Sequence, residues 1–402
     1  MIAILLAPVY LLANYYLLRR VMGWVKAWFP FFRTVRHWAL PVAVQSFLAC
    51  SIVIAFFLPE GEFRRIMKLI GNYWLGVLLY VLLAVVTADL LRLLFCHVLP
   101  FKHIFVTTRM HRIAGCVCAL IILAASVWGI INAQIIHVTP YEVTVNKAVE
   151  GIDEMKIVLV ADLHLGYNIG EKQMRQMVER INEQDADLVV IAGDIFDNEW
   201  EAVQEPARMA KILRGIKSRY GVYACYGNHD IEEPILAGFT FRQSAPKASS
   251  PEMDAFLTAA GIRLLRDEGV LIEDSFYLYG RADARRPGAG ITKRETPREI
   301  TANMDKSKLI IVLDHQPREL AALAAAGVDL DLCGHTHDGQ MFPGNLVVRP
   351  FWENFYGYLK KGDMHNIVTS GVGLFGPNMR VGTKAEICPI TVHFAGSAAE
   401  RS

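Results

Sequence analysis

The pattern of apolar and polar positions divides this chain into two different parts. Within the first 140 residues, four apolar runs approach or exceed the roughly 20 residues that a helix needs to cross a bilayer. They are approximately Ile2–Leu18, Trp38–Leu58, Asn72–Phe95 and Ile113–Ile136. Four such runs in succession, almost free of charge, predict an all-α region of four transmembrane helices over residues 1–137 rather than four buried core helices. Because Arg19 and Arg20 follow the first run instead of preceding it, we expect a retained helix and not a cleaved signal peptide.

From about residue 155 the apolar pattern changes to short β-branched runs that alternate with amphipathic helical stretches, which is typical of an α/β domain. The expected strands are Lys156–Val160, Leu188–Ala192, Val222–Tyr226, Phe276–Tyr279, Leu309–Leu313, Asp329–Cys333, Leu346–Val348, Asn366–Thr369 and Ala385–His393. The expected helices are Glu171–Asn182 and a stretch that ends near Lys217. We therefore expect a linker over residues 138–154, an α/β domain over residues 155–396 and a short tail over residues 397–402.

The two parts also differ in charge, although the 402-residue chain has a net charge of only +1. Residues 1–140 contain 12 Lys and Arg against 3 Asp and Glu, and the remainder contains 29 against 37. The first part is therefore basic and the second acidic. An acidic domain without a basic stripe argues against nucleic acid as the main partner.

Basic residues in the loops between the apolar runs indicate the orientation in the membrane. The first loop contains Arg19, Arg20, Lys26, Arg33 and Arg36, and the third contains Arg92, Lys102, Arg109 and Arg112. The second loop contains Arg64, Arg65 and Lys68, which Glu60 and Glu62 offset. We therefore expect a multi-pass membrane protein whose first and third loops are cytoplasmic, with everything after about residue 137 outside the cytoplasm. Asp89, the one acidic residue inside a span, is expected near a helix end, where it faces neighbouring helices.

Candidate metal ligands follow the ends of the predicted strands. They are Asp162 and His164, then Asp194, then Asn228 with His229 and Asp230, then His315, and finally His335 and His337. Carboxylates, amide oxygens and imidazoles are donors that divalent cations use, and open α/β sheets place their sites at the carboxyl ends of strands. In an extended backbone, residues two apart point the same way, so each of the two pairs would face one metal cluster. Singly, each residue also fits an ordinary turn or core position, but together they are too many for one ion and predict a two-metal hydrolytic centre.

These motifs resemble the calcineurin-like metallophosphoesterase superfamily over roughly residues 155–395. The motifs are Asp162-x-His164, Gly193-Asp194, Gly227-Asn228-His229-Asp230, His315 and Gly334-His335-Thr336-His337. Within the superfamily, Gly334–Gln340, Ser370–Gly373 and Pro377–Arg380 are similar to the bacterial membrane-associated phosphodiesterases of the YaeI/YkuE type. The resemblance implies a four-layer α-β-β-α sandwich. Asp338 departs from the pattern, because this subgroup usually has glycine after the second histidine.

The resemblance also implies how the ligands divide between two ions. The first ion would be held by Asp162, His164, Asp194 and His337, and the second by Asp194, Asn228, His315 and His335, with Asp194 bridging. It implies Mn, Fe or Zn rather than Mg alone, and the imidazoles favour the same metals. The ions would lower the pKa of a bridging water, and the resulting hydroxide would attack phosphorus. His229 is our candidate general acid, oriented by Asp230.

The substrate is less constrained than the chemistry. A domain anchored in the bilayer favours a membrane or envelope substrate, such as a lipid-linked phosphodiester or pyrophosphate. Two irregular stretches, Phe241–Pro251 and Arg281–Arg298, are expected to overhang the site. The basic residues of the second, Arg281, Arg285, Arg286, Lys293, Arg294 and Arg298, either bind a second phosphate or an anionic headgroup or form a solvated loop.

Three other functions stay open at this point. They are a phosphomonoesterase or phosphoprotein phosphatase, a scaffold that has lost catalysis, and a non-catalytic metal-binding membrane sensor. The ligand set is complete, which argues against a scaffold, and a single intramembrane acid gives little support to transport. The sequence leaves the oligomeric state open.

Overall fold

The computed structural model describes residues 2–99, 102–149, 152–232, 235–236, 239–240, 249–288, 291 and 293–395. The chain forms two compact units. The first comprises Met1–Ile131, Ile235–Phe241 and Gly376–Met379, and the second comprises Asn132–Pro234, Arg242–Phe375 and Arg380–Ser402. The expected tail, residues 397–402, and most of the expected Phe241–Pro251 loop lie outside the described residues.

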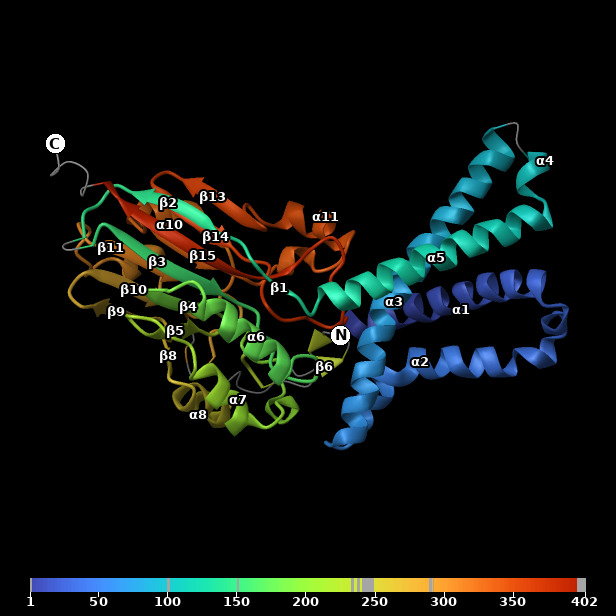
Figure 1. Cartoon of the computed structure of the whole chain (residues 1–402), viewed down its shortest axis with the longest axis horizontal. Coiled ribbons are helices and arrows are strands. Elements are labelled where there is room, and N and C mark those ends of the chain that lie inside the picture. Colours follow the sequence, from blue (N-terminus) through green and yellow to red (C-terminus); the bar gives the residue numbers. More distant parts are fainter. Residues whose placement is uncertain are drawn as a thin grey trace. The chain divides into compact units, whose positions relative to one another are not determined.

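The first unit is built from long apolar helices (Figure 1). They are α1 (Ile2–Trp28), α2 (Ala39–Phe57), α3 (Glu62–Leu93) and α5 (Thr108–Asn132), with the short α4 (Lys102–Phe105) between the last two. Among the described residues, Val35–Phe57, Glu62–Val98 and Thr108–Asn132 are long and apolar enough to cross a membrane. The first predicted run forms α1. The side chains of residues 2–6 lie outside the described part of the chain. The prediction of an apolar helical region is confirmed. The region contains four long helices, and three stretches of it meet the length and hydropathy of a membrane span among the described residues.

Asp89 lies on α3 and faces α1, as expected for an acidic residue within a span. It accepts a hydrogen bond from the hydroxyl of Tyr16 and forms an ion pair with Arg20. Because an unpaired carboxylate in an apolar environment is costly, this pairing accounts for Asp89 without a transport role.

The second unit contains two β-sheets (Figure 1). The seven-stranded sheet has the order β1-β15-β3-β4-β5-β8, with β2 also paired to β15. Its strands are β1 (Ile136–Val138), β2 (Tyr141–Val145), β3 (Glu154–Val160), β4 (Leu188–Ala192), β5 (Val222–Cys225), β8 (Ile262–Leu264) and β15 (Ala385–Phe394). The six-stranded sheet has the order β13-β14-β12-β11-β10-β9. Its strands are β13 (Gly357–Lys361), β14 (Met364–Val368), β12 (Leu330–Cys333), β11 (Leu309–Leu313), β10 (Phe276–Gly280) and β9 (Glu268–Ile272).

Helices cover the outer face of each sheet and complete four layers. Side chains of β3 alternate between two cores, because successive residues of a strand point to opposite faces. Ile157 and Leu159 are buried between the two sheets, whereas Val158 and Val160 are buried under α6 (Glu171–Asn182), α7 (Pro206–Leu213) and α8 (Pro251–Ala259). A third core packs α9 (Pro297–Ile300) and α10 (Leu320–Ala326) on the six-stranded sheet. The predicted α-β-β-α sandwich is confirmed.

Two expected segments differ from the structure. Within the expected linker, residues 138–154, the chain forms the strand β2, which pairs in parallel with β15, with Tyr141 opposite Ile390. The expected strand Leu346–Val348 is wrong, since these residues belong to the helix α11 (Gly344–Val348). A short apolar run does not distinguish strand from helix by its periodicity.

Parallel pairing brings the carboxyl ends of the central strands to one edge. Val160 of β3 lies opposite Ile191 of β4, and Ala192 of β4 lies opposite Cys225 of β5. In the other sheet, Leu313 of β11 lies opposite Leu332 of β12. The residues that follow these five strands therefore emerge together.

Candidate metal centre

The candidate ligands lie on turns with left-handed backbone conformation. The φ angles are 52° at Asp162, 46° at His164, 50° at Asp194, 74° at His335 and 52° at His337. Such angles are uncommon for non-glycine residues and cluster at functional sites. The backbone is therefore not extended at either pair. Asp162 and His164 lie in one group of ligand atoms, whereas His335 and His337 lie in different groups. Backbone hydrogen bonds between the turns hold this conformation, with the His164 N–H donating to the Asp194 carbonyl at 3.0 Å.

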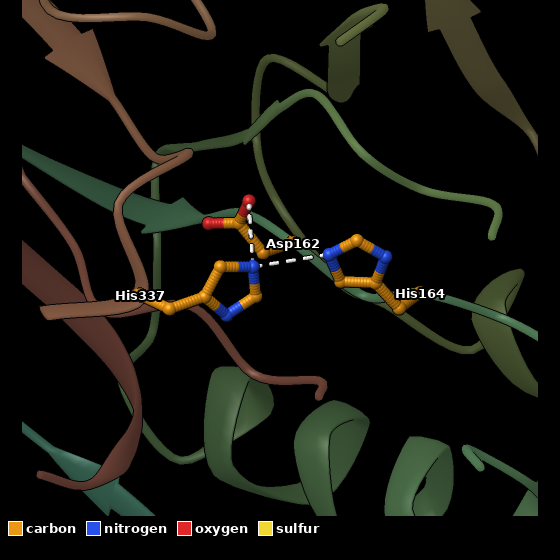
Figure 2. A group of neighbouring side chains, drawn as sticks. All are labelled: Asp162, His164 and His337. Carbon is orange, nitrogen blue, oxygen red and sulfur yellow. Dashed lines mark hydrogen bonds and ion pairs between the residues drawn. The ribbon is translucent and has the colours of Figure 1, made fainter. Parts of the chain in front are cut away.

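The first group of ligand atoms comes from Asp162, His164 and His337 (Figure 2). Nε2 of His337 lies 3.1 Å from Nε2 of His164 and 3.6 Å from Oδ1 of Asp162. All three residues are buried. Figure 2 shows the His337 imidazole meeting the side chains of Asp162 and His164, although His337 follows His164 by 173 residues.

The second group comes from Asp194, His315 and His335. Nε2 of His315 lies 3.1 Å from Oδ2 of Asp194 and 3.1 Å from Nδ1 of His335. The other ring nitrogen of His315, Nδ1, lies 2.9 Å from the Ala192 carbonyl oxygen. Because a carbonyl only accepts, it holds a proton on Nδ1 and leaves Nε2 as the ring atom directed at the group, as in histidines that bind metals.

Asp194 connects the two groups. Its Oδ2, 3.1 Å from His315, is also 3.9 Å from Nε2 of His164 in the first group. Its Oδ1 accepts the backbone N–H of His229 at 2.8 Å, which fixes the carboxylate. Burial alone would raise the pKa of Asp194, but His315 and His229 outweigh it and hold the pKa well below its ordinary value. Asp194 is therefore the ionised carboxylate of the centre.

The donor set fits divalent metal ions. Oδ1 of Asn228 is buried and has no hydrogen-bond partner among the described residues, which is rare for a buried side-chain oxygen. A cation ligated by this oxygen would satisfy it. Several imidazoles beside carboxylates suit Mn, Fe or Zn better than Mg, which demands oxygen ligands.

Burial sets the protonation of the last two histidines. It lowers the pKa of both His335 and His337 well below the ordinary value, and the nearby His315 and His164 lower them further. Both imidazoles are therefore neutral at neutral pH, which is the form that binds metals. Burial raises the pKa of Asp162 to about 6, and a cation beside it would favour the ionised form.

Two glycines leave room for the Asp162 carboxylate. A Cβ on Gly334 would lie 2.6 Å from Oδ2 of Asp162. A Cβ on Gly371 would lie 2.6 Å from Cβ of Asp162, and its φ of +76° is itself unfavourable for other residues. The centre therefore depends on glycine at both positions.

His229 has a different carboxylate neighbour from the one we expected. Both oxygens of Asp230 accept backbone hydrogen bonds, from Phe196 at 2.8 Å and from Gly227 at 2.7 Å. Asp230 therefore holds the two turns together rather than orienting the His229 ring. Oδ1 of Asp197 lies 3.8 Å from Nδ1 of His229 and 3.4 Å from Nδ1 of His164. Asp197 follows Asp194 by three residues in a turn. Neither the strand periodicity nor a recognised motif predicts a role for it.

Arg380 was not assigned a role from the sequence, although its side chain is buried beside His337. Its Nη2 donates to the carbonyls of Ser370 at 2.7 Å and Gly373 at 2.8 Å, and it lies 3.5 Å from Nδ1 of His337. Arg380 therefore supports the loop behind the first ligand group. A lone arginine in a glycine-rich tail gives no indication of this role in the sequence.

Two aromatic rings border the centre. The ring of Phe375 lies 4.9 Å from that of His229, and the ring of Trp352 lies 5.1 Å from that of His335, measured between centroids. Each ring covers one of the two ligand groups, because Phe375 also lies 6.0 Å from His164.

Most of the basic 281–298 stretch serves the fold or faces solvent. Arg281 is buried and pairs with Asp314 at 2.7 Å, and Arg294 pairs with the same carboxylate at 3.2 Å. Arg285, Lys293 and Arg298 are exposed, and residues 289, 290 and 292 lie outside the described residues. Arg286 is the basic residue of this stretch that reaches the centre, since its Nη1 donates to the Asn228 carbonyl at 3.1 Å.

The departure at Asp338 has a backbone explanation. Asp338 has a φ of 51°, a left-handed conformation that glycine adopts freely and aspartate tolerates. Burial raises the pKa of its carboxyl to about 6.

Comparisons with known proteins agree with this arrangement. Residues 155–339 match the sequence model of the family described as calcineurin-like phosphoesterase. A Danio rerio protein named "Transmembrane protein with metallophosphoesterase domain" is 31% identical over 294 residues, which is 69% of this chain and 62% of that protein. The chain thus spans less than two thirds of that relative.

Two bacterial proteins are matched over more of their length. An "Uncharacterized metallophosphoesterase" of Aquifex aeolicus is 29% identical over 272 residues, 66% of this chain and 95% of that protein. The "Uncharacterized metallophosphoesterase YkuE" of Bacillus subtilis is 26% identical over 277 residues, 65% of this chain and 87% of that protein. With its sandwich fold and its clustered histidines and aspartates, the part of the chain that this family model matches is a metallophosphoesterase domain of the calcineurin-like superfamily.

Proposed function

We propose that this protein is a membrane-anchored phosphoesterase with two metal ions that hydrolyses phosphodiester or pyrophosphate bonds. The position of Asp194 carries the proposal. Its Oδ2 lies 3.1 Å from Nε2 of His315 and 3.9 Å from Nε2 of His164, so one carboxylate is within reach of both ligand groups. A carboxylate shared in this way is how a protein holds two cations close together.

The ligand assignment follows the two groups. Asp162, His164 and His337 would hold the first ion with Asp194, and His315, His335 and Asn228 would hold the second with Asp194. Support for Asn228 comes from its buried and otherwise unpartnered Oδ1. Two bound divalent ions would supply an activated water and neutralise charge on the phosphate.

The chain's own residues would handle the leaving group. His229 is nearly buried, and its backbone N–H donates to Asp194, which places the ring beside both ligand groups. We assign His229 the role of general acid, which donates a proton to the leaving oxygen. Asp197 faces its Nδ1 and would hold the ring orientation, and Phe375 packs against the same ring.

The membrane region supports a substrate located in a bilayer or cell envelope. Three described helices are long and apolar enough to span a membrane, so a lipid-linked phosphodiester or pyrophosphate is the substrate class that we favour. The basic residues of the first and third loops support a multi-pass topology with the phosphoesterase domain outside the cytoplasm.

Hydrolysis of two chromogenic esters tests the activity. The purified full-length protein, loaded with Mn²⁺ in detergent, is assayed with bis-p-nitrophenyl phosphate and with p-nitrophenyl phosphate, and the Asp194→Asn variant is the control. We expect faster hydrolysis of the diester and loss of that activity in the variant. Faster hydrolysis of the monoester would favour a phosphomonoesterase, and hydrolysis of neither would contradict the proposal.

A reporter fusion tests the topology. Alkaline phosphatase fused after the last residue is active only outside the cytoplasm, and we expect it to be active. An inactive fusion, combined with fluorescence from a cytoplasmic reporter at the same position, would overturn the proposed orientation.

A further inference from the structure

The phosphoesterase domain exposes large apolar side chains mainly in one short segment. From β1 onwards, the described residues with exposed large apolar side chains are Leu271, Phe342, Leu346, Val347, Phe351 and Tyr358. Four of these six lie within residues 342–351, and their exposed fractions are 47% at Phe342, 58% at Leu346, 63% at Val347 and 75% at Phe351. Soluble surfaces usually scatter such residues singly, and a contiguous group indicates a contact surface.

The composition of the segment points to lipid rather than protein. Residues 341–352 contain no acidic residue and a single basic one, Arg349, which is exposed. Trp352 follows directly. Exposed Phe, Leu and Val with a nearby cation and a tryptophan form the combination that lies in the boundary between lipid headgroups and acyl chains.

The segment is fixed at both ends. At its start, the backbone N–H of Phe342 donates to the carbonyl of Val381 at 2.8 Å. At its end, the Arg318 guanidinium lies 4.5 Å from the Trp352 ring centroid. The exposed apolar side chains are therefore held by the fold on α11 and the turn that follows it.

The same segment is directly connected to the metal centre. It begins after the ligand candidates His335 and His337, and the Trp352 ring at its other end lies 5.1 Å from the His335 ring. The hydroxyl of Thr336, between the two histidines, donates to the carbonyl of Phe355 at 2.5 Å. A molecule bound to this segment would therefore lie near the second group of ligand residues.

We propose that residues 342–351 form an interfacial strip that enters the headgroup–acyl boundary of the bilayer beside the metal centre. Chain connectivity supports this occupant, because only three residues separate the end of α5 at Asn132 from the start of β1 at Ile136. The strip starts near this junction, because Nδ2 of Asn132 donates to the carbonyls of Arg380 and Thr383, and the Val381 carbonyl between them in sequence accepts from Phe342. The strip rests on the proposed function and would bring phosphate esters of the bilayer beside the second group of ligand residues.

Photo-cross-linking tests the contact itself. Full-length protein with p-benzoylphenylalanine in place of Val347 is placed in phosphatidylglycerol–phosphatidylcholine nanodiscs, irradiated and examined by mass spectrometry. The matched control carries the same group in place of Leu271, which is 43% exposed on β9. We expect lipid adducts at position 347 and far fewer at 271. Absence of lipid adducts at 347, or an adduct with a second protein chain instead, would overturn the proposal.

Kinetics then test whether the contact serves catalysis. The variant Leu346→Ser/Val347→Ser/Phe351→Ser is compared with Leu271→Ser on soluble bis-p-nitrophenyl phosphate and on a phosphodiester lipid in nanodiscs. We expect the triple variant to lose activity only on the bilayer substrate, on the order of tenfold, because interfacial binding scales with buried apolar area. Unchanged hydrolysis of the lipid, or equal loss on both substrates, would contradict the inference. If the unaltered protein hydrolysed no diester, the proposed function would fail. The cross-linking result would still show whether the strip contacts lipid.

Discussion

The Asp197 carboxylate lies 3.8 Å from Nδ1 of His229, on the ring atom opposite the one that would meet a leaving group. An imidazole that donates through Nε2 needs its Nδ1 fixed by an acceptor, and a carboxylate is the strongest acceptor available. At 3.8 Å the pair is an electrostatic contact rather than a hydrogen bond, so Asp197 places negative charge beside Nδ1 of His229 without accepting its proton. Burial lowers the pKa of His229 to about 4 even though Asp194 and Asp197 oppose it, so the anionic phosphate of a bound substrate would have to raise this pKa for the ring to act as an acid near pH 7.

Replacement of His229 separates proton donation from metal binding. We expect His229→Ala to retain both metal ions and to lower kcat about 10²- to 10⁴-fold, the usual contribution of general acid catalysis. The loss should be greater for an alkyl phosphodiester than for a p-nitrophenyl ester, since p-nitrophenolate leaves without a proton. Steady-state rates and metal analysis check both points. An equal loss on both esters would exclude His229 as the acid.

The two aspartates near His229 should respond differently to substitution. Asp197→Asn removes the charge facing Nδ1 of His229 and of His164, and outer partners of this kind are worth about 10- to 100-fold in activity or metal affinity. Asp230→Ala leaves the N–H groups of Phe196 and Gly227 unpaired, which costs about 1–3 kcal/mol for each buried group. We therefore expect a kinetic defect at Asp197 with little change in Tm, and a lowered Tm at Asp230. The reverse pattern would show that Asp230 orients the ring.

Metal content distinguishes the ligands of each ion. We expect His337→Ala to lose the ion of the first group and His335→Ala the ion of the second, so that each variant binds about half the metal of the unaltered protein. Asp194→Ala should lose nearly all metal, because Asp194 serves both groups. Plasma mass spectrometry on desalted protein measures the ratios. Retention of two ions per chain by Asp194→Ala would contradict the bridging role.

Much of this fold could be predicted from the sequence because local patterns were strong. β4, α6 and β11 have the predicted bounds, since β-branched runs and a 12-residue amphipathic stretch leave little choice. The failures are those in which tertiary context decides. β2 forms because β15 offers an edge, and Leu346–Val348 is helical although its residues favour strand. The side chains of this segment are not buried in a core, so no alternation of buried and exposed positions favours a strand.

The site shows the same division. The candidate ligands were found because each follows a strand, and parallel strands end at one edge. The residues that orient them escaped prediction, because Asp197 and Arg380 act through contacts between turns that are distant in sequence. Asp230 was assigned to its sequence neighbour His229, but its carboxylate turns to the backbone of Phe196 and Gly227 instead. The left-handed φ angles at the ligands likewise follow from packing between loops and not from residue type.

Asp331, on β12, gives a pH dependence that does not involve the metal ligands. Burial, followed by the nearby Asp314 carboxylate, raises the pKa of Asp331 to about 8 in the folded protein. In the unfolded chain an aspartate titrates near 4, so between about pH 4 and pH 8 the folded state holds one more proton. The free energy of unfolding should therefore fall as pH rises through this window. Below it, the contribution of Asp331 is fully present.

The Asp331→Asn variant should remove that dependence, because asparagine keeps the shape of the protonated carboxyl without ionising. Oδ2 of Asp331 accepts from Asn366 at 2.9 Å, and the side-chain carbonyl oxygen of the introduced asparagine would take over this contact. At pH 8 we expect the variant to be more stable than the unaltered protein by roughly 4 kcal/mol, because about 1.4 kcal/mol accrues for each of the three pH units above pH 5, and to have a Tm about 8–16 °C higher. At pH 5 the two should differ little. Thermal unfolding in detergent, followed by circular dichroism at both pH values, measures the difference, and a variant that is less stable at pH 8 would show that Asp331 is ionised in the folded protein.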